Sequence, residues 1–81
     1  MRVEILDIAL KDLKQIDKSE VIKIFHKIES LENFPKVSNI KKLVNYKPSY
    51  RLRVGNYRVL FDVDCEQIIV GRILHRSKSY E

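Results

Sequence analysis

Hydrophobic and polar positions repeat with two different periods along this chain. Residues 2–6 alternate one by one, which predicts a first strand. Residues 8–16 and 19–31 instead repeat their apolar positions at helical spacing. The Asn-Phe-Pro sequence at 33–35 ends the second of these stretches, because proline cannot continue a helix. Since a linker of only two residues separates the two helices, we expect an antiparallel helical hairpin.

The second helix has the stronger pattern. Asp7 is a candidate N-cap for the first helix, and Asp17, with Glu20 three residues later, resembles a capping box for the second. The second helix then carries one apolar stripe, which we expect to face the core: Val21, Ile24, Phe25, Ile28 and Leu31.

Residues 50–54 and 57–63 alternate again, and Gly55-Asn56 between them suits a two-residue hairpin turn. This register places Arg53 directly opposite Arg58. The predicted core face carries Leu52, Val54, Tyr57, Val59 and Phe61, and the other face carries Arg51, Arg53 and Arg58. Two opposed arginines with Cα atoms roughly 5 Å apart repel each other. The arrangement therefore favours a negatively charged partner.

A last strand is expected over residues 68–75, after a turn at 65–67. A three-residue loop pairs Val63 with Ile69, Phe61 with Gly71 and Val59 with Ile73. Arg72 and Arg76 then lie on the same face as the hairpin arginines. A two- or four-residue loop turns both toward the helices, where unpaired charge is costly to bury. We therefore expect the three-residue loop.

The connector at 36–49 is basic, and its apolar residues Ile40, Leu43 and Val44 are expected to pack under the sheet edge. The order of elements is β-α-α-β-β-β. This order describes one α+β domain over residues 1–81, with both helices on one face of a mainly antiparallel sheet.

The net charge of +5 is unevenly distributed. Residues 1–34 carry a balance of −1 and residues 35–81 a balance of +6. The stretch 33–61 has no acidic residue but seven basic ones: Lys36, Lys41, Lys42, Lys47, Arg51, Arg53 and Arg58. Such asymmetry indicates a polyanionic partner, first of all nucleic acid; the alternative is a basic surface kept for solubility. A single cysteine, and no signal peptide or membrane-length apolar run, predict a cytoplasmic protein.

The pattern resembles the RelE/ParE superfamily of toxins from type II toxin–antitoxin systems. The resemblance covers nearly the whole chain, and it is carried by Phe34-Pro35, Leu43, the hairpin sequence at 50–61, Leu74-His75-Arg76 and Tyr80. It implies the RelE fold, which is shared with small microbial ribonucleases. RelE-type members cleave messenger RNA in the ribosomal decoding site, using the RNA's own 2′-hydroxyl and neither metal nor cofactor. ParE-type members inhibit DNA gyrase.

The resemblance also implies partners and a site. Both types are neutralised by a tightly bound antitoxin, here expected to be RelB-like, and the complex commonly binds operator DNA through the antitoxin. The implied catalytic residues are Arg53, Arg58, Arg76 and Tyr80. From the basic charge of this half of the chain we also expect a wider set of RNA-binding residues: Arg51, Lys36, Lys41, Lys42, Lys47, Arg72 and His75. One departure is that this chain has arginines before the turn, where the best-known RelE proteins have lysines.

The residue types fit metal-free RNA cleavage. Guanidinium groups match phosphate oxygens and stabilise the extra negative charge of the transition state. Arginine is a poor base because its pKa stays above about 12, which leaves Tyr80, His75 or a group of the RNA or ribosome. Other interpretations stay open: an ion pair of Arg58 with Asp62, a structural His75, a ParE-like inhibitor without chemistry, or a basic nucleic-acid-binding module.

Overall fold

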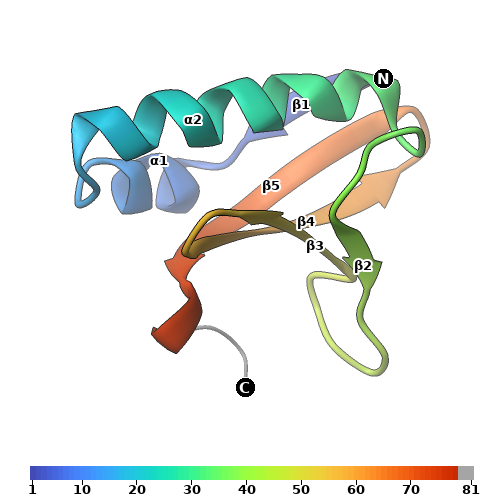
Figure 1. Cartoon of the computed structure of the whole chain (residues 1–81). Coiled ribbons are helices and arrows are strands. Elements are labelled where there is room, and N and C mark those ends of the chain that lie inside the picture. Colours follow the sequence, from blue (N-terminus) through green and yellow to red (C-terminus); the bar gives the residue numbers. More distant parts are fainter. Residues whose placement is uncertain (79–81) are drawn as a thin grey trace.

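A computed structural model describes residues 1–78 of the chain, which form one mixed five-stranded sheet with two helices on one side (Figure 1). The elements are β1 (Arg2–Ile5), α1 (Asp7–Leu13), α2 (Lys18–Glu29), the 3₁₀ turn η1 (Ser30–Asn33), β2 (Ile40–Lys42), β3 (Tyr50–Val54), β4 (Tyr57–Asp64), β5 (Gln67–His75) and the 3₁₀ turn η2 (Arg76–Lys78). The strand order is β1-β5-β4-β3-β2. β1 and β5 are parallel, and the other neighbours are antiparallel.

The predicted α+β fold class and the final meander of three strands are confirmed, and β2 is an additional edge strand. Its three residues pair with β3, so that Lys41 lies opposite Arg51. The predicted order of elements had no strand in the basic connector. In this part of the chain it instead extends the sheet beyond the arginine-bearing strand.

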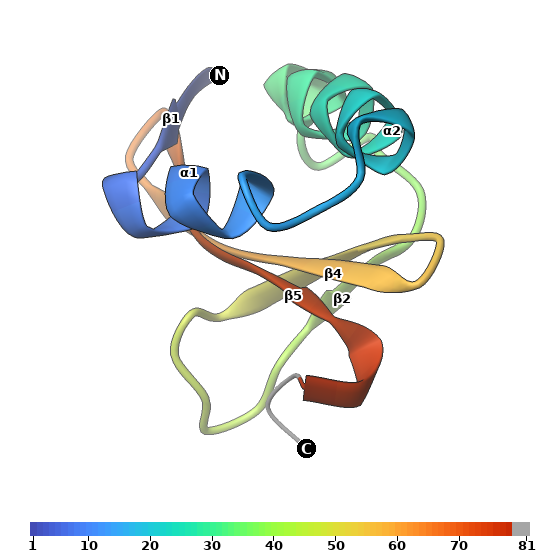
Figure 2. The same cartoon turned by 90° about the vertical axis from the view of Figure 1, so that its left-hand side faces the viewer.

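Both helices differ in detail from their predicted form. α1 begins after Leu6 rather than after Asp7 and ends at Leu13, three residues early. Asp17 is the N-cap of α2, but its backbone carbonyl accepts the hydrogen bonds and its side chain makes none. Figure 2 shows α2 nearly end-on while α1 lies across the view, so the helical hairpin is crossed rather than antiparallel. No helix among residues 1–78 is long and apolar enough to span a membrane.

The core lies between the helices and the sheet. Its largest fully buried side chains in this layer are Phe61, Ile24, Ile28, Leu31, Leu52, Ile68, Val59 and Val70. Three residues of the predicted α2 stripe are therefore buried, but Phe25 is 44% exposed. Phe25 lies beside β1 at the margin of the sheet, where no further element covers it. The predicted stripe therefore faces the core as expected, but it included one residue, Phe25, that the core does not bury.

The turn between β4 and β5 has two residues, not three. Asp64 pairs with Gln67, and Cys65 takes a positive φ of 57°. Val63 therefore pairs with Ile68 and Phe61 with Val70, so both predicted pairs here were wrong. A bulge next to Gly71 then adds one residue to β5 and restores the predicted pair of Val59 with Ile73.

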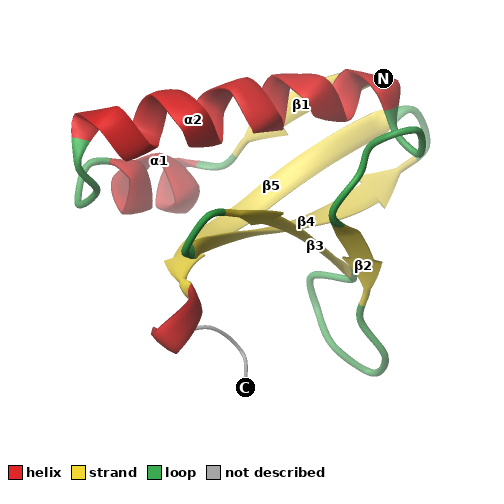
Figure 3. Ribbon diagram, viewed as in Figure 1, coloured by secondary structure: helices red, strands yellow, loops and turns green. Residues whose placement is uncertain are grey.

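The loop between β2 and β3 packs on the outer face of the sheet, the face opposite the helices (Figure 3). The backbone N–H of Ser49 donates to Asp62 Oδ1 at 2.7 Å, and Pro48 Cγ lies 3.4 Å from where a Cβ on Gly71 would be. Leu43 is buried as expected, but Val44 is 84% exposed at the loop tip. The loop covers the middle of the outer face and does not reach the β3–β4 turn.

Candidate functional site

The β3–β4 hairpin positions the candidate site. Arg53 lies directly opposite Arg58, as predicted, and Arg51 lies one alternation further along β3 with Lys41 beside it on β2. Gly55 makes the tight turn possible, because its φ of 58° is disfavoured for residues with a Cβ. We call Lys41, Arg51, Arg53 and Arg58 the arginine face.

Electrostatics on the arginine face favour an anion. Arg53 is exposed, and Arg51 and Arg58 are half-buried. Among residues 1–78, Arg51 and Arg53 form no ion pair, and the buried Nε of Arg51 has no hydrogen-bond partner. Phosphate oxygens would screen the repulsion between the opposed guanidinium groups and accept hydrogen bonds from them.

Asp62 is the acidic residue that the sequence offered as an ion-pair partner for Arg58. Its Oδ1 accepts the hydrogen bond from Ser49 N–H and lies 3.9 Å from Lys47 Nζ. The carboxylate therefore anchors the β2–β3 loop, of which Lys47 is a part.

The C-terminal residues approach the same turn from β5. The backbone N–H of Arg76 donates to the carbonyl of Asn56 at 2.8 Å, which fixes η2 beside the hairpin turn. Arg76 is exposed there. Tyr80 lies outside the described residues, so its catalytic role stays a prediction.

His75 lies on the other side of the sheet from the arginine face. It pairs with Tyr57, and the two rings meet edge to face at 5.3 Å. Its Nδ1 lies 2.8 Å from Ser77 Oγ and accepts from Ser77 N–H at 3.2 Å. The structural interpretation of His75 is therefore favoured over a role among the arginines.

Arg72 corrects the expected site. On β5 Arg72 pairs with Leu60, which in turn pairs with Arg51 on β3. The guanidinium of Arg72 nevertheless does not join the arginine face. Arg72 Nε and Nη2 donate to the two carboxylate oxygens of Asp12 on α1, at 2.8 and 3.0 Å. β1 pairs with β5 only as far as Val70, so it does not supply a partner for the backbone N–H of Ile73. Asp12 accepts a hydrogen bond from this N–H at 2.9 Å. Asp12 thus neutralises Arg72 and completes the strand edge.

This contact predicts a loss of stability when the carboxylate is removed. Partial burial raises the pKa of Asp12, but the hydrogen bonds from Arg72 and Ile73 lower it more, so its pKa lies below the usual value. A lowered pKa gives stability that is present above the unfolded value, near 4, and is lost as the pH falls through the folded value. We expect Asp12→Asn to lower the free energy of unfolding by about 1–2 kcal/mol at neutral pH, allowing for the partly exposed Arg72. Urea titrations of both proteins at neutral pH and below pH 4 check this: the difference should shrink in acid.

The four predicted RNA-binding lysines are all exposed but do not form one cluster. Lys41 adjoins the arginine face. Lys42 pairs with Tyr50 and so lies on the opposite face of β2, with its Nζ 6.0 Å from the Tyr50 ring centroid. Lys36 lies in the loop between η1 and β2. Contacts of these lysines with RNA stay a prediction.

Sequence reasoning missed two apolar grooves along α2. The groove between α1 and α2 has a volume of about 610 Å³ and is lined by Leu10, Leu13, Ile16, Val21 and Ile22, with Lys14 and Lys18 among them. Leu10 is 41% and Ile22 is 59% exposed. An apolar residue on the outer side of a helix, such as Ile22, was the available signal. We call this hollow the α1–α2 groove.

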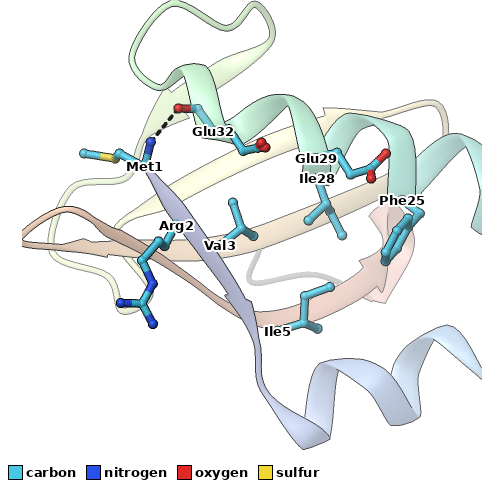
Figure 4. Close-up of a pocket in the computed structure, with 8 residues that line it drawn as sticks. All are labelled: Met1, Arg2, Val3, Ile5, Phe25, Ile28, Glu29 and Glu32. Atoms are coloured by element: carbon cyan, nitrogen blue, oxygen red, sulfur yellow. Dashed lines mark hydrogen bonds between the residues drawn. The ribbon is translucent and has the colours of Figure 1, made fainter.

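The second groove lies between β1 and the C-terminal half of α2. Figure 4 shows Val3, Ile5 and Ile28 on its floor and Phe25 at one end. Glu29 and Glu32 lie at its α2 side, and the amino group of Met1 donates to the carbonyl of Glu32 at 2.8 Å. Arg2 also lines this groove, which thus carries acidic and basic groups, whereas the charged residues of the α1–α2 groove are lysines.

Comparisons with known proteins agree with this architecture. Residues 3–80 match the sequence model of the ParE toxin of the type II toxin–antitoxin system parDE. Toxin RelE3 of Methanocaldococcus jannaschii is 35% identical, over 100% of this chain and 97% of its own length. The RelB–RelE antitoxin–toxin complex from Methanococcus jannaschii matches with a TM-score of 0.75 and 34% identity, covering 90% of this chain and 89% of that chain. The archaeal RelE–RelB complex from Pyrococcus horikoshii OT3 matches with a TM-score of 0.78 and 25% identity, covering 96% and 97%.

The fold, a mixed five-stranded sheet with two helices on one side, therefore matches that of the RelB–RelE complex and defines a RelE-type toxin. The chain belongs to the RelE/ParE superfamily and is a RelE-like toxin of a type II toxin–antitoxin system.

Proposed function

We propose that this toxin is a ribosome-dependent endoribonuclease that cleaves messenger RNA in the cytoplasm, without metal or cofactor, and so inhibits translation. The observation that carries the proposal is the direct opposition of Arg53 and Arg58 beside the β3–β4 turn. Two guanidinium groups fixed on paired strands form a preorganised positive site for one phosphodiester.

In the proposed reaction the 2′-hydroxyl oxygen attacks the adjacent phosphorus, and the bond to the 5′-oxygen breaks. The products are a cyclic phosphate and a 5′-hydroxyl. Arg53 and Arg58 stabilise the additional negative charge on the phosphate oxygens, and Arg76 approaches from η2. Tyr80 or a group of the RNA or ribosome accepts the proton from the 2′-hydroxyl, because arginine keeps its own proton. A solvent water gives a proton to the 5′-oxygen as it leaves.

A RelB-like antitoxin is the proposed partner, since the solved relatives are complexes of RelE with RelB. We place one amphipathic antitoxin segment in the α1–α2 groove, where it would cover Leu10 and Ile22. The lysines of this groove, Lys14 and Lys18, complement an acidic flank on that segment. The toxin–antitoxin complex is proposed to bind operator DNA through the antitoxin.

Substitution in the α1–α2 groove is expected to weaken neutralisation. Ile22→Glu places a carboxylate in the apolar contact and should raise the antitoxin Kd at least about tenfold. Val44→Glu is a matched control, because Val44 is also an exposed aliphatic residue but lies on the outer-face loop. Calorimetric titration of purified antitoxin into each folded variant checks the prediction. Equal affinities for the two variants would exclude this groove as the antitoxin site.

The family match favours a second candidate, inhibition of DNA gyrase without RNA cleavage. Controlled expression separates the two functions. Mapping of RNA 5′ ends should reveal new ends inside translated codons if the toxin is a ribonuclease. Intact messenger RNA together with altered plasmid supercoiling would instead establish the gyrase-directed function.

A further inference from the structure

A third hollow lies on the helix side of the sheet, at the end of β5 and away from the arginine face. It has a volume of about 440 Å³, and the residues that carry the argument are Asp12, Gln15, Tyr57, Arg72, His75 and Lys78. They come from α1, β4, β5 and η2. The volume falls within the range of small-ligand pockets, about 300–1,000 Å³.

The ion pair with Asp12 makes Arg72 a rigid donor. A guanidinium has five N–H groups, and Asp12 accepts from two of them, so three remain for a ligand. Asp12 is itself held in place by Ile73 N–H. The plane of the guanidinium is thus fixed before any ligand arrives, which reduces the entropy lost on binding.

The remaining donors suit a base edge better than a free anion. The ion pair cancels the formal charge of Arg72, which weakens attraction to a phosphate but leaves directional hydrogen bonds. Guanine offers two adjacent acceptors, O6 and N7, which an arginine fork contacts as a pair. Adenine has a donor in place of O6, so its edge fits this fork less well.

Other residues of the hollow offer contacts for the base plane and the phosphate of a nucleotide. Tyr57 and His75 present two rings in edge-to-face contact at 5.3 Å, a surface on which a base plane can pack. The amide of Gln15 offers both a donor and an acceptor. Lys78 is exposed beside the same hollow and provides a cation for a phosphate.

We propose that this hollow is a guanine-nucleotide subsite, in which Arg72 reads the base edge and Lys78 contacts the phosphate. Where the proposed RNA function holds, the occupant is a guanosine of the same RNA strand that is cleaved on the arginine face. Binding of a single nucleotide needs neither ribosome nor cleavage, so this subsite and the proposed enzymatic function can fail separately.

The test is titration of the isolated toxin with GMP, AMP, CMP and UMP, followed by amide shifts in ¹H–¹⁵N spectra. GMP should shift the amides of Gln15, Tyr57, Ile73 and Lys78 and bind at least about fivefold more tightly than AMP. Lys78→Ala and Gln15→Ala should each weaken GMP binding about threefold or more, since each removes one polar contact and neither residue is in the ion pair. Lys27→Ala, which removes an exposed lysine on α2, should leave it unchanged.

Arg72→Lys keeps the charge but removes the fork, and it should abolish the preference for GMP over AMP. The dispersion of the same spectra shows whether Arg72→Lys is folded. If it is not, Lys78→Ala and Gln15→Ala still test the proposal. The proposal is overturned if GMP shifts only the arginine face, if all four nucleotides bind equally, or if Lys78→Ala and Gln15→Ala bind GMP like the parent protein.

Discussion

Arg58→Ala is expected to abolish toxicity and to lower the rate of RNA cleavage by about 10²-fold or more, the usual cost of losing one preorganised donor to a transition state. Arg58 lies opposite Arg53 on the outer face, so its removal leaves the core untouched and relieves a repulsion. The free energy of unfolding should change by less than about 1 kcal/mol. Growth after induction and cleavage on programmed ribosomes measure the two effects.

Arg2→Ala is the matched control for this experiment. It also removes an arginine from a strand, but Arg2 lies on the edge strand β1, which β5 separates from the strand β4 that carries Arg58. It should stay fully toxic. Arg58→Lys restores a charge without the two-pronged geometry and should recover only part of the rate. Full toxicity of a folded Arg58→Ala protein would remove Arg58 from the site.

The hairpin is the part of this site that sequence determined best. Alternation fixes which face each residue takes, and the Gly-Asn turn fixes the register, so the opposition of Arg53 and Arg58 follows from local rules. The burial of Ile24, Ile28 and Leu31 follows from helical period in the same way. Both features depend on neighbours within a few residues along the chain.

The predictions that were wrong concern contacts between segments that are distant along the chain. The alternation of apolar and polar residues does not reveal the bulge at Gly71. One added residue on β5 compensates for a turn that is one residue shorter than expected. Asp12 and Arg72 are 60 residues apart, so no periodicity could pair them. Their ion pair removes Arg72 from the arginine face and places it in the hollow beside α1.

The grooves along α2 were also not predicted from the sequence, for a different reason. A hydrophobic stripe predicts a covered face, but Phe25 of the stripe and Ile22 outside it stay 44% and 59% exposed in the described part of the chain. An 81-residue chain has few residues for a second layer of packing. Exposed apolar side chains therefore remain for a partner, as expected of a toxin that is held in a complex.

The largest loss of stability is expected from Phe61→Ala. Phe61 is fully buried; its ring stacks on Tyr50 at 5.4 Å and meets Phe34 edge to face at 5.9 Å. Deleting a buried phenylalanine costs about 3–5 kcal/mol, which is a large part of the total for a domain of this size. We expect the midpoint of thermal unfolding to fall by about 15 °C or more. The variant is best made together with Arg58→Ala, so that expression does not arrest the host.

Phe25→Ala distinguishes burial from the mere loss of an aromatic ring. Phe25 is 44% exposed beside β1, so its removal should cost less than about 1 kcal/mol and shift the midpoint by only a few degrees. Because β4 carries both Phe61 and Arg58, loosening the aromatic cluster also loosens the strand that holds the arginine face. Added antitoxin should restore part of the lost stability by mass action. If Phe61→Ala unfolds at nearly the parent temperature, this cluster does not hold the hairpin in place.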